Sequence, residues 1–440
     1  MLCLMEGKNM KTTNKWQSIV CIVLILTMII GIWKGPQYLN KWMTSNTNVS
    51  ENVVQAASAS ETKEVRAVWI SYLDFASAGV SKMSEQKFQN YVNKMFDKCV
   101  KLKMNTVIVQ VRPFGDAMYH SKYFPWSVVA SGKQGRSPGY DPLKCMVKAA
   151  HARNLEIHAW INPYRVTLSD TKMSSLSSSN PAVKWKKSKS SSTRRNVLSF
   201  GGAMYYNPAK ASVRGLIVDG VEELVENYDV DGIHMDDYFY PTLGTGYKSN
   251  FDAVEYKAYK KNCNKNGKTA LGIVQWRRKN VDLLLSEVYA SIKKIDKEVV
   301  FGVSPAGNIN NLYGNDRYYC DVKKWMSKSG YVDYMCPQIY WSFSNKICPY
   351  TATVKRWCSI KKNAKVDLYI GLAAYRAGIS KTEAQAIGDT GWSSGKDILK
   401  RQVVAARKQK KVKGFVFFRY DNMISSKTKK EVSNLKKVFS

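Results

Sequence analysis

From Val65 onward, short apolar runs rich in β-branched and aromatic residues alternate with longer stretches whose apolar residues recur every three to four positions. This alternation predicts βα units and a parallel sheet. We place eight strands near residues 65–72, 106–111, 156–161, 232–235, 299–304, 331–340, 368–373 and 414–418. Helical patterns lie at 84–102, 141–153, 210–228, 281–295, 397–408 and 427–438. Eight strands and a terminal helix predict an α/β protein, a single (β/α)8 TIM barrel over residues 64–440.

One segment interrupts this regular order. Residues 167–206, after the third strand, are rich in Ser and Lys. Such a composition predicts a long surface loop inserted into the barrel. The chain carries no internal repeat that would indicate a solenoid or propeller.

The N-terminal region has the features of a membrane segment. Lysines in residues 1–15 precede a nearly unbroken apolar run, which has Trp16 and Trp33 at its two ends. Tryptophan suits membrane interfaces, so we predict a short cytoplasmic tail at 1–15, a signal-anchor at 16–33 and a polar, flexible linker at 34–63. The expected location is the cell membrane, with a single pass and the barrel outside the cytoplasm. Cleaved secretion is the alternative, although no small-residue cleavage site follows at the usual distance.

The formal charge of +34 is unusually high for 440 residues. It indicates either a solvated, lysine-rich surface or attraction to a polyanion. Because the barrel is expected outside the cytoplasm, nucleic acid is excluded as a partner. An anionic cell-wall polymer and the membrane remain as partners.

The nine cysteines show no metal or disulfide pattern. Their number is odd, their spacings are wide and no CxxC pair occurs. A pairing of Cys348 with Cys358 is left open. The four histidines never fall at i, i+4, and no glycine-rich phosphate loop is present. We therefore expect neither a metal nor another cofactor.

The candidate chemistry centres on residues 231–238. Apolar Ile233 and Met235 alternate with His234 and Asp236, so one face of this strand is apolar and the other polar. Active sites of (β/α) barrels lie at the C-terminal ends of the strands. Asp236 is the first candidate for acid/base catalysis. Asp237 is the second, because it reaches the site only if the chain bends after the strand.

The same alternation assigns polar groups to the lumen on other strands. By parity, Gln110 and Arg112 face inward on the second strand, while Gln338 and Tyr340 share one side of the sixth. A lone inward polar group is more often a hydrogen-bonded core residue than a catalyst, but a cluster on four strands indicates a site. The remaining inward candidates are His158, Trp160, Asn162, His234 and Tyr238.

Aromatic residues follow the strand ends closely. Such rings stack on the apolar faces of sugars, although they also serve simply to fill a barrel rim. Arg112, Arg165 and Arg376 are candidates to hold an acidic group of a substrate. The aromatic candidates for substrate binding are Trp160, Tyr164, Tyr238, Tyr340, Trp341 and Tyr375.

Several motifs together resemble one family, the glycosyl-hydrolase-like family ten. They are Glu64–Ile70, Gln110–Pro113, His158–Arg165, Asp231–Pro241, Val303–Pro305, Pro337–Trp341 and Gly371–Leu372. The resemblance covers residues 64–420 in order, and the set is highly specific. The family contains YngK-like proteins and bacterial hydrolases of peptidoglycan strands that lack stem peptides. The resemblance therefore implies a TIM-barrel glycosidase of cell-wall glycan and favours the acids of the fourth strand.

The fourth strand also resembles the chitinase pattern D-x-D-x-E. Here His234, Asp236 and Tyr238 occupy that register, so a tyrosine stands where chitinases carry the acid. A simple chitinase mechanism is therefore not expected, and assistance by the sugar's acetamido group is left open.

We thus expect a glycoside hydrolase that cleaves β-linked amino-sugar glycan of the cell wall with two carboxylates. The alternative is a barrel that binds wall carbohydrate without catalysis, which the lack of a glutamate at any strand end favours. A deacetylase or esterase is a weaker third hypothesis, because neither a metal triad nor a nucleophile elbow is present.

Overall fold

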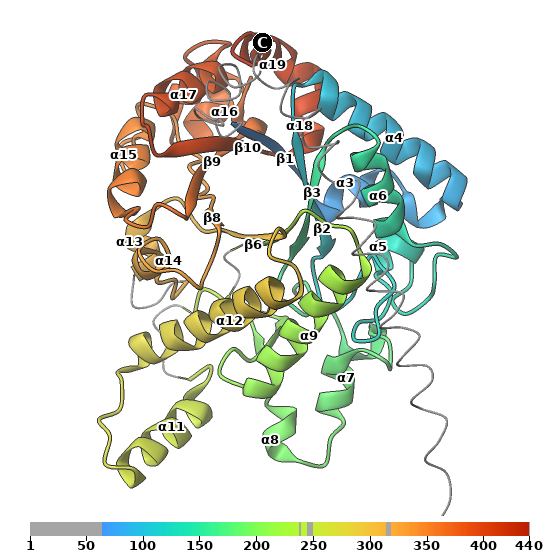
Figure 1. The fold of residues 1–440 in the computed structure, drawn as a ribbon, viewed down its shortest axis with the longest axis vertical. Helices are drawn as coiled ribbons and strands as arrows, with labels where there is room; N and C mark the ends of the chain where they lie inside the picture. Colours follow the sequence, from blue (N-terminus) through green and yellow to red (C-terminus); the bar gives the residue numbers. More distant parts are fainter. Residues whose placement is uncertain (1–63, 237–238, 244–249, 314–317, 440) are drawn as a thin grey trace, which may run out of the picture. The chain divides into compact units, whose positions relative to one another are not determined.

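Eight parallel strands close into a barrel in the order β1-β10-β9-β8-β7-β6-β3-β2, with helices around it (Figure 1). The computed structural model describes residues 64–236, 239–243, 250–313 and 318–439. The predicted tail, anchor and linker, and also Asp237 and Tyr238, lie outside the described residues. The barrel strands are β1 Val65–Ile70, β2 Thr106–Arg112, β3 Glu156–Ile161, β6 Gly232–Asp236, β7 Val300–Ser304, β8 Tyr334–Met335, β9 Asp367–Ala373 and β10 Val412–Phe418.

Helices connect these strands and bury their apolar faces against the outside of the barrel. The longer ones are α4 Glu85–Lys101, α6 Pro142–His151, α9 Ala211–Asn227, α11 Ala253–Lys265, α12 Ile273–Ile295, α15 Tyr350–Ile360, α17 Ile398–Arg407 and α19 Lys429–Lys436. The short helices are α3 Tyr72–Ser77, α5 Val128–Ser131, α7 Pro181–Lys186, α8 Ser191–Arg194, α13 Ile309–Tyr313, α14 Val322–Trp325, α16 Lys381–Ala386 and α18 Tyr420–Ile424. Among the described residues, no helix has the length and hydrophobicity needed to cross a membrane.

Strand alternation divides the core into two parts. Outward residues such as Val107 and Val109 join the large apolar layer between strands and helices. Inward residues fill the lumen instead, as expected for a packed barrel. The lumenal cluster consists of Ala67, Trp69, Ile108, Trp160, Tyr334, Cys336, Tyr369 and Val416.

All eight predicted strands are present, but several details of the prediction are wrong, and helices α11 and α15 lie outside the predicted helical ranges. The sixth strand, β8, has two residues, because Pro337 lacks an N–H and only an isolated bridge at Gln338 continues the pairing. The insertion at 167–206 is more than a loop, since it contains α7, α8 and an antiparallel hairpin of β4 Val197–Phe200 and β5 Ala203–Tyr206. Helix α12 begins at Ile273, eight residues before the predicted start.

The described cysteines are buried free thiols, Cys348 and Cys358 included, so the pairing left open by the sequence is absent. Burial raises the pKa of the Cys99 thiol to about 12. These side chains therefore behave as small apolar core groups.

A glycine on β7, Gly302, makes room in the lumen for the ring of Tyr334. A Cβ added at Gly302 would lie 2.0 Å from Cζ of Tyr334, which belongs to the neighbouring strand β8. Gly302 thus makes space for a tyrosine whose hydroxyl reaches toward the centre of the barrel.

We expect Gly302→Ala to lower the free energy of unfolding by about 1–3 kcal/mol, because the added methyl group collides with the ring of Tyr334. Urea denaturation measures this change. Gly215→Ala is the control: apart from its chain neighbours and the backbone of α9 itself, no atom lies within 4 Å of the added Cβ, so it should be neutral or stabilise by up to about 1 kcal/mol. Equal midpoints for Gly302→Ala and the wild type would contradict the proposed packing.

Candidate active site

The strand tips surround a cavity of about 250 Å³ at the C-terminal end of the barrel. Seven of the eight strands, or the residues just after them, contribute to its wall. The lining residues are Trp69, Trp160, Asp236, Ser304, Gln338, Tyr340, Tyr375 and Phe418. A lining that combines polar groups with aromatic rings is suited to a sugar ring, which has polar edges and apolar faces.

Asp236 is held in a fixed orientation although it is only 3% exposed. The Nδ2 atom of Asn162 donates to its two carboxylate oxygens at 2.8 and 2.7 Å. Gln110 Nε2 donates in turn to Asn162 Oδ1 at 2.7 Å, and the backbone N–H of Tyr72 donates to Gln110 Oε1 at 3.1 Å. Three strands thus fix one carboxylate, which can then exchange a proton with a bound sugar or water.

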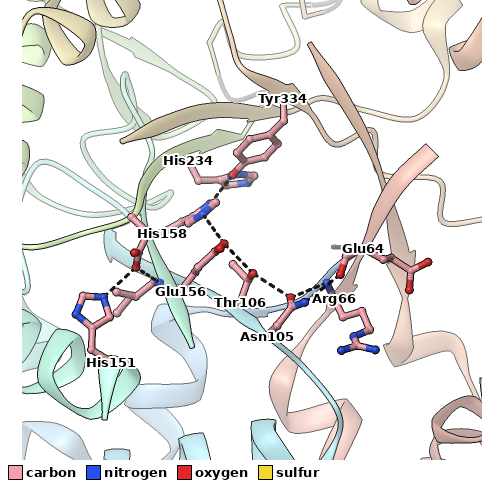
Figure 2. Close-up of polar contacts among 11 residues, drawn as sticks. Glu64, Arg66, Asn105, Thr106, His151, Glu156, His158, His234 and Tyr334 are labelled. Carbon is pink, nitrogen blue, oxygen red and sulfur yellow. Dashed lines mark hydrogen bonds and ion pairs between the residues drawn. The ribbon is translucent and has the colours of Figure 1, made fainter. Parts of the chain in front are cut away.

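A second series of hydrogen bonds runs through the lumen below the cavity. Trp69 Nε1 donates to His234 Nε2 at 3.1 Å, and His234 Nδ1 lies 2.8 Å from the hydroxyl of Tyr334. His158 Nδ1 lies 2.9 Å from the same hydroxyl. In Figure 2, polar contacts continue from His158 toward Glu156 at the far end of the barrel.

The tryptophan determines the direction of this series. An indole N–H can only donate, so His234 Nε2 accepts and its proton resides on Nδ1. The Tyr334 hydroxyl then accepts from His234 and donates to His158 Nδ1. Burial agrees with two neutral rings: it lowers the pKa of His234 well below its usual value and that of His158 to about 4. The series therefore positions Trp69, a wall of the cavity, without placing a charge beneath it.

The structure brings five of the predicted site residues to the cavity itself. They are Asp236, Trp160, Gln338, Tyr340 and Tyr375. Asn162 lies one contact away, through Asp236. His158 and His234 were expected to touch substrate or Asp236, but they lie below the cavity and bind Tyr334.

Arg112 does not face the lumen as parity predicts. The pairing of β2 with β3 shifts register between Gln110 and Arg112, and this irregularity changes the alternation. The guanidinium carbon lies 4.3 Å from the ring centre of Phe124. Among the described residues, its three nitrogens have no hydrogen-bond partner, and burial lowers its pKa.

The other predicted binding residues lie outside the cavity wall. Tyr164 is fully buried, and Arg165 stacks on Phe114 with 5.3 Å from the guanidinium to the ring centre. Trp341 is half-buried, with its backbone oxygen bound by Gln402 Nε2 at 3.0 Å. Arg376 contacts Tyr375, which lines the cavity. Their roles in binding stay predictions.

The other described carboxylates at strand ends have structural partners. Asp74 accepts from the backbone and hydroxyl of Ser71 and pairs with Arg419 at 3.4 Å, and burial raises its pKa to about 6. Asp421 pairs with Arg419 at 3.1 Å. Asp116 is buried and accepts from Gln134 at 3.1 Å. None of the three lines the cavity.

The cavity contains residues that the sequence analysis did not assign to the site. Trp69, Ser304 and Phe418 line it from β1, β7 and β10. Parity could have identified Trp69, which alternates with outward Val68 and Ile70. Ser304 pairs in register with Asp236, a fact that requires knowledge of the strand order.

Comparison with known proteins identifies the family of the chain. The model of a family described as "Glycosyl hydrolase-like 10" matches residues 64–430. The chain belongs to this family. It is 38% identical over 381 residues to "Glycosyl hydrolase YngK" of Bacillus subtilis (strain 168), covering 82% of this chain and 69% of that protein. It is 33% identical over 403 residues to "Glycosyl hydrolase DigH" of Escherichia coli (strain K12), covering 86% and 88%.

Solved structures confirm the barrel fold alone. The β-galactosidase from Marinomonas ef1 superposes with a TM-score of 0.53 at 9% identity, over 85% of this chain and 59% of that one. The endo-1,4-β-mannanase from Rhizomucor miehei gives 0.50 at 10% identity, over 87% and 96%. Within the family, the chain is a glycosyl hydrolase-like (β/α)8 barrel. Among the described residues, no group of three His, Cys, Asp or Glu could hold a metal ion.

The depressed pKa of His158 predicts how stability depends on pH. Between pH 6.5 and about 4 the unfolded state binds a proton at this histidine and the folded state does not. Stability therefore falls as the pH drops through this window, by about 3 kcal/mol for a shift of this size. His158→Gln should flatten the slope of unfolding free energy measured by urea denaturation from pH 7 to pH 4.

Exposed His120 provides the matched control, because His120→Gln also removes one imidazole. This variant should keep the wild-type slope. If His158→Gln and His120→Gln give the same pH profile, His158 does not remain neutral in the folded protein.

Proposed function

We propose that this protein is a glycoside hydrolase that cleaves the β-linked amino-sugar glycan of the bacterial cell wall, with peptidoglycan strands that lack stem peptides as its substrate. Asp236 serves as the acid/base group. The observation that carries the proposal is the double hydrogen bond from Asn162 to Asp236 inside an aromatic cavity. A carboxylate held at a fixed angle to a bound sugar meets the geometric requirement for proton transfer.

The size of the cavity supports a substrate without peptide side chains. Its volume of about 250 Å³ lies below the roughly 300–1,000 Å³ of pockets that enclose a drug-sized ligand. One sugar ring therefore occupies it, between rings such as Trp69, Trp160 and Tyr340. A bare sugar ring is the occupant that this volume favours over a sugar that carries a stem peptide.

The proposed location is outside the cytoplasm, where this substrate occurs. It rests on the predicted signal-anchor at 16–33 and linker at 34–63. We also retain cleaved secretion as the alternative processing of this segment.

A non-catalytic carbohydrate-binding barrel is the second candidate function. It is favoured by one observation: among the described residues that line the cavity, Asp236 is the only carboxylate. Hydrolysis of a glycosidic bond ordinarily uses two. Asp237 is the proposed second group, and its place lies outside the described residues. Incubating the protein with peptide-stripped glycan and measuring new reducing ends distinguishes a hydrolase from a binding protein.

Asp236→Asn should reduce the release of reducing ends by at least about 10³-fold, because an amide cannot exchange the proton that the reaction requires. The fold should be retained, with thermal unfolding a few degrees lower, because one of the two oxygens that accept from Asn162 becomes an NH2 group. Asp421→Asn is the control, as it removes a strand-end carboxylate that does not line the cavity. It should keep most of the activity. Wild-type turnover by Asp236→Asn would remove Asp236 from the mechanism.

Peptide-stripped strands should be cleaved with a kcat/KM at least about tenfold higher than the same strands carrying stem peptides. A tenfold preference corresponds to roughly 1.4 kcal/mol at the transition state. Both substrates come from one glycan preparation, before and after removal of the peptides, so chain length is matched. Equal rates on the two preparations would exclude the proposed selectivity while leaving hydrolysis itself intact.

A further inference from the structure

Lysines and arginines are concentrated on one side of the end of the barrel opposite the cavity, while the segments before β6, β7 and β8 at this end carry Asp229, Asp231, Asp296, Glu298 and Asp333. The segments 98–103, 361–365 and 407–413 each join the end of a helix to the start of β2, β9 or β10, and 436–437 end α19. Thirteen of these twenty residues are Lys or Arg and none is acidic, against 68 Lys and Arg in the 440 residues of the chain. We call these four segments the basic face.

The four segments form one continuous region. Strands β9, β10, β1 and β2 are neighbours in the barrel, and α15, α17, α19 and α4 follow one another around it in Figure 1. Helices α4 and α19 also flank a groove of about 560 Å³, which has apolar residues in its lining and Lys98, Lys101, Lys429 and Lys436 along it. The exposed apolar side chains Val100 and Ile424 lie at 42% and 40% exposure in the same region.

The charge of the basic face is largely uncompensated. Acids at its edge are Glu64, which binds Arg407 at 2.7 Å, half-buried Asp367 at the start of β9, and exposed Asp97, which precedes Lys98 and pairs with Arg153 at 2.7 Å. Burial and the nearby positive charges of Lys411 and Lys413 lower the pKa of Lys361. The exposed lysines are Lys98, Lys101, Lys103, Lys362, Lys365, Lys408, Lys410, Lys411, Lys413 and Lys437.

The chain enters the barrel at this same face. Glu64 precedes β1 and contacts Arg407 at the end of α17, and the predicted linker and anchor come directly before it in the sequence. We propose that the basic face docks on an anionic lipid bilayer, with lipid phosphates between its lysines. Docking then directs the cavity away from the membrane. The inference rests on the predicted anchor and is independent of hydrolysis.

Clusters of lysine beside a membrane segment are attracted to anionic lipid, and this attraction is screened by salt. The test uses the full chain reconstituted in vesicles of phosphatidylcholine alone or with 30% phosphatidylglycerol. An amine-acylating reagent and mass spectrometry report the reactivity of each lysine. Lysines of the basic face should react at least about fivefold more slowly in the anionic vesicles, and 0.5 M salt should remove the difference.

The lysines of α11 provide an internal control, since Lys257, Lys260, Lys261 and Lys265 are exposed on a helix away from the basic face. Their reactivity should be equal in the two vesicle types. Equal reactivity of the basic face in both vesicle types would overturn the proposal. Slower labelling of α11 to the same degree would overturn it too, because it would indicate general shielding.

Matched variants separate docking from hydrolysis. Replacing Lys362, Lys365, Lys408 and Lys410 by Gln should restore labelling of the remaining basic-face lysines in anionic vesicles. The same four-charge change in α11 should not. Both variants should cleave soluble glycan like the wild type, so a failure of docking and a failure of the proposed function are distinguishable. If soluble poly(glycerol phosphate) slows acylation of the basic-face lysines and anionic vesicles do not, the membrane proposal is overturned and the partner is an anionic wall polymer.

Discussion

The hydrogen bonds from Asn162 to Asp236 are the interaction on which the candidate site depends. A carboxylate that is 3% exposed needs donors nearby, because an unpaired buried charge is strongly unfavourable. Asn162 supplies them only while Gln110 occupies its own oxygen, and Gln110 is itself held by the N–H of Tyr72. The direction of Asp236 therefore depends on three strands and the start of α3, and no side chain in this series can turn alone.

The lumen beneath the cavity obeys the same constraint with neutral groups. Trp69, His234, Tyr334 and His158 satisfy one another without an ionised member. Two protonated histidines there would attract the Asp236 carboxylate downward and repel each other in a medium of low dielectric constant. Because these rings are neutral, they place no positive charge beneath Asp236. Gly302 completes this arrangement by admitting the Tyr334 ring.

The sequence alone predicted most of the barrel, because its eight apolar runs, the alternation along strands and the three-to-four-residue spacing along helices are all local signals. Parity also placed Asp236, Trp160 and Asn162 correctly, since strand alternation holds wherever pairing is regular. It failed at Arg112, where a register shift that no local pattern reveals turns the side chain away. The partners of His158 and His234 were equally inaccessible, because Tyr334 lies 100 residues or more from each. The hairpin within 167–206 was missed because its polar composition resembles a loop.

The helix dipole is a simpler explanation for some lysines of the basic face, but it acts only over the last turn of each helix. Cations stabilise the C-terminal ends of helices within the last turn, which accounts for Lys98, Lys101 and Lys436. Lys411 has a comparable role, because its Nζ donates to the carbonyls of Cys358 and Lys361 at 2.9 and 2.8 Å at the end of α15. The dipole does not extend to lysines beyond the last turn, such as Lys365, Lys410 and Lys413. Since these exposed lysines repel one another and weaken the fold on their own, the excess is better explained by an anionic partner than by helix stability.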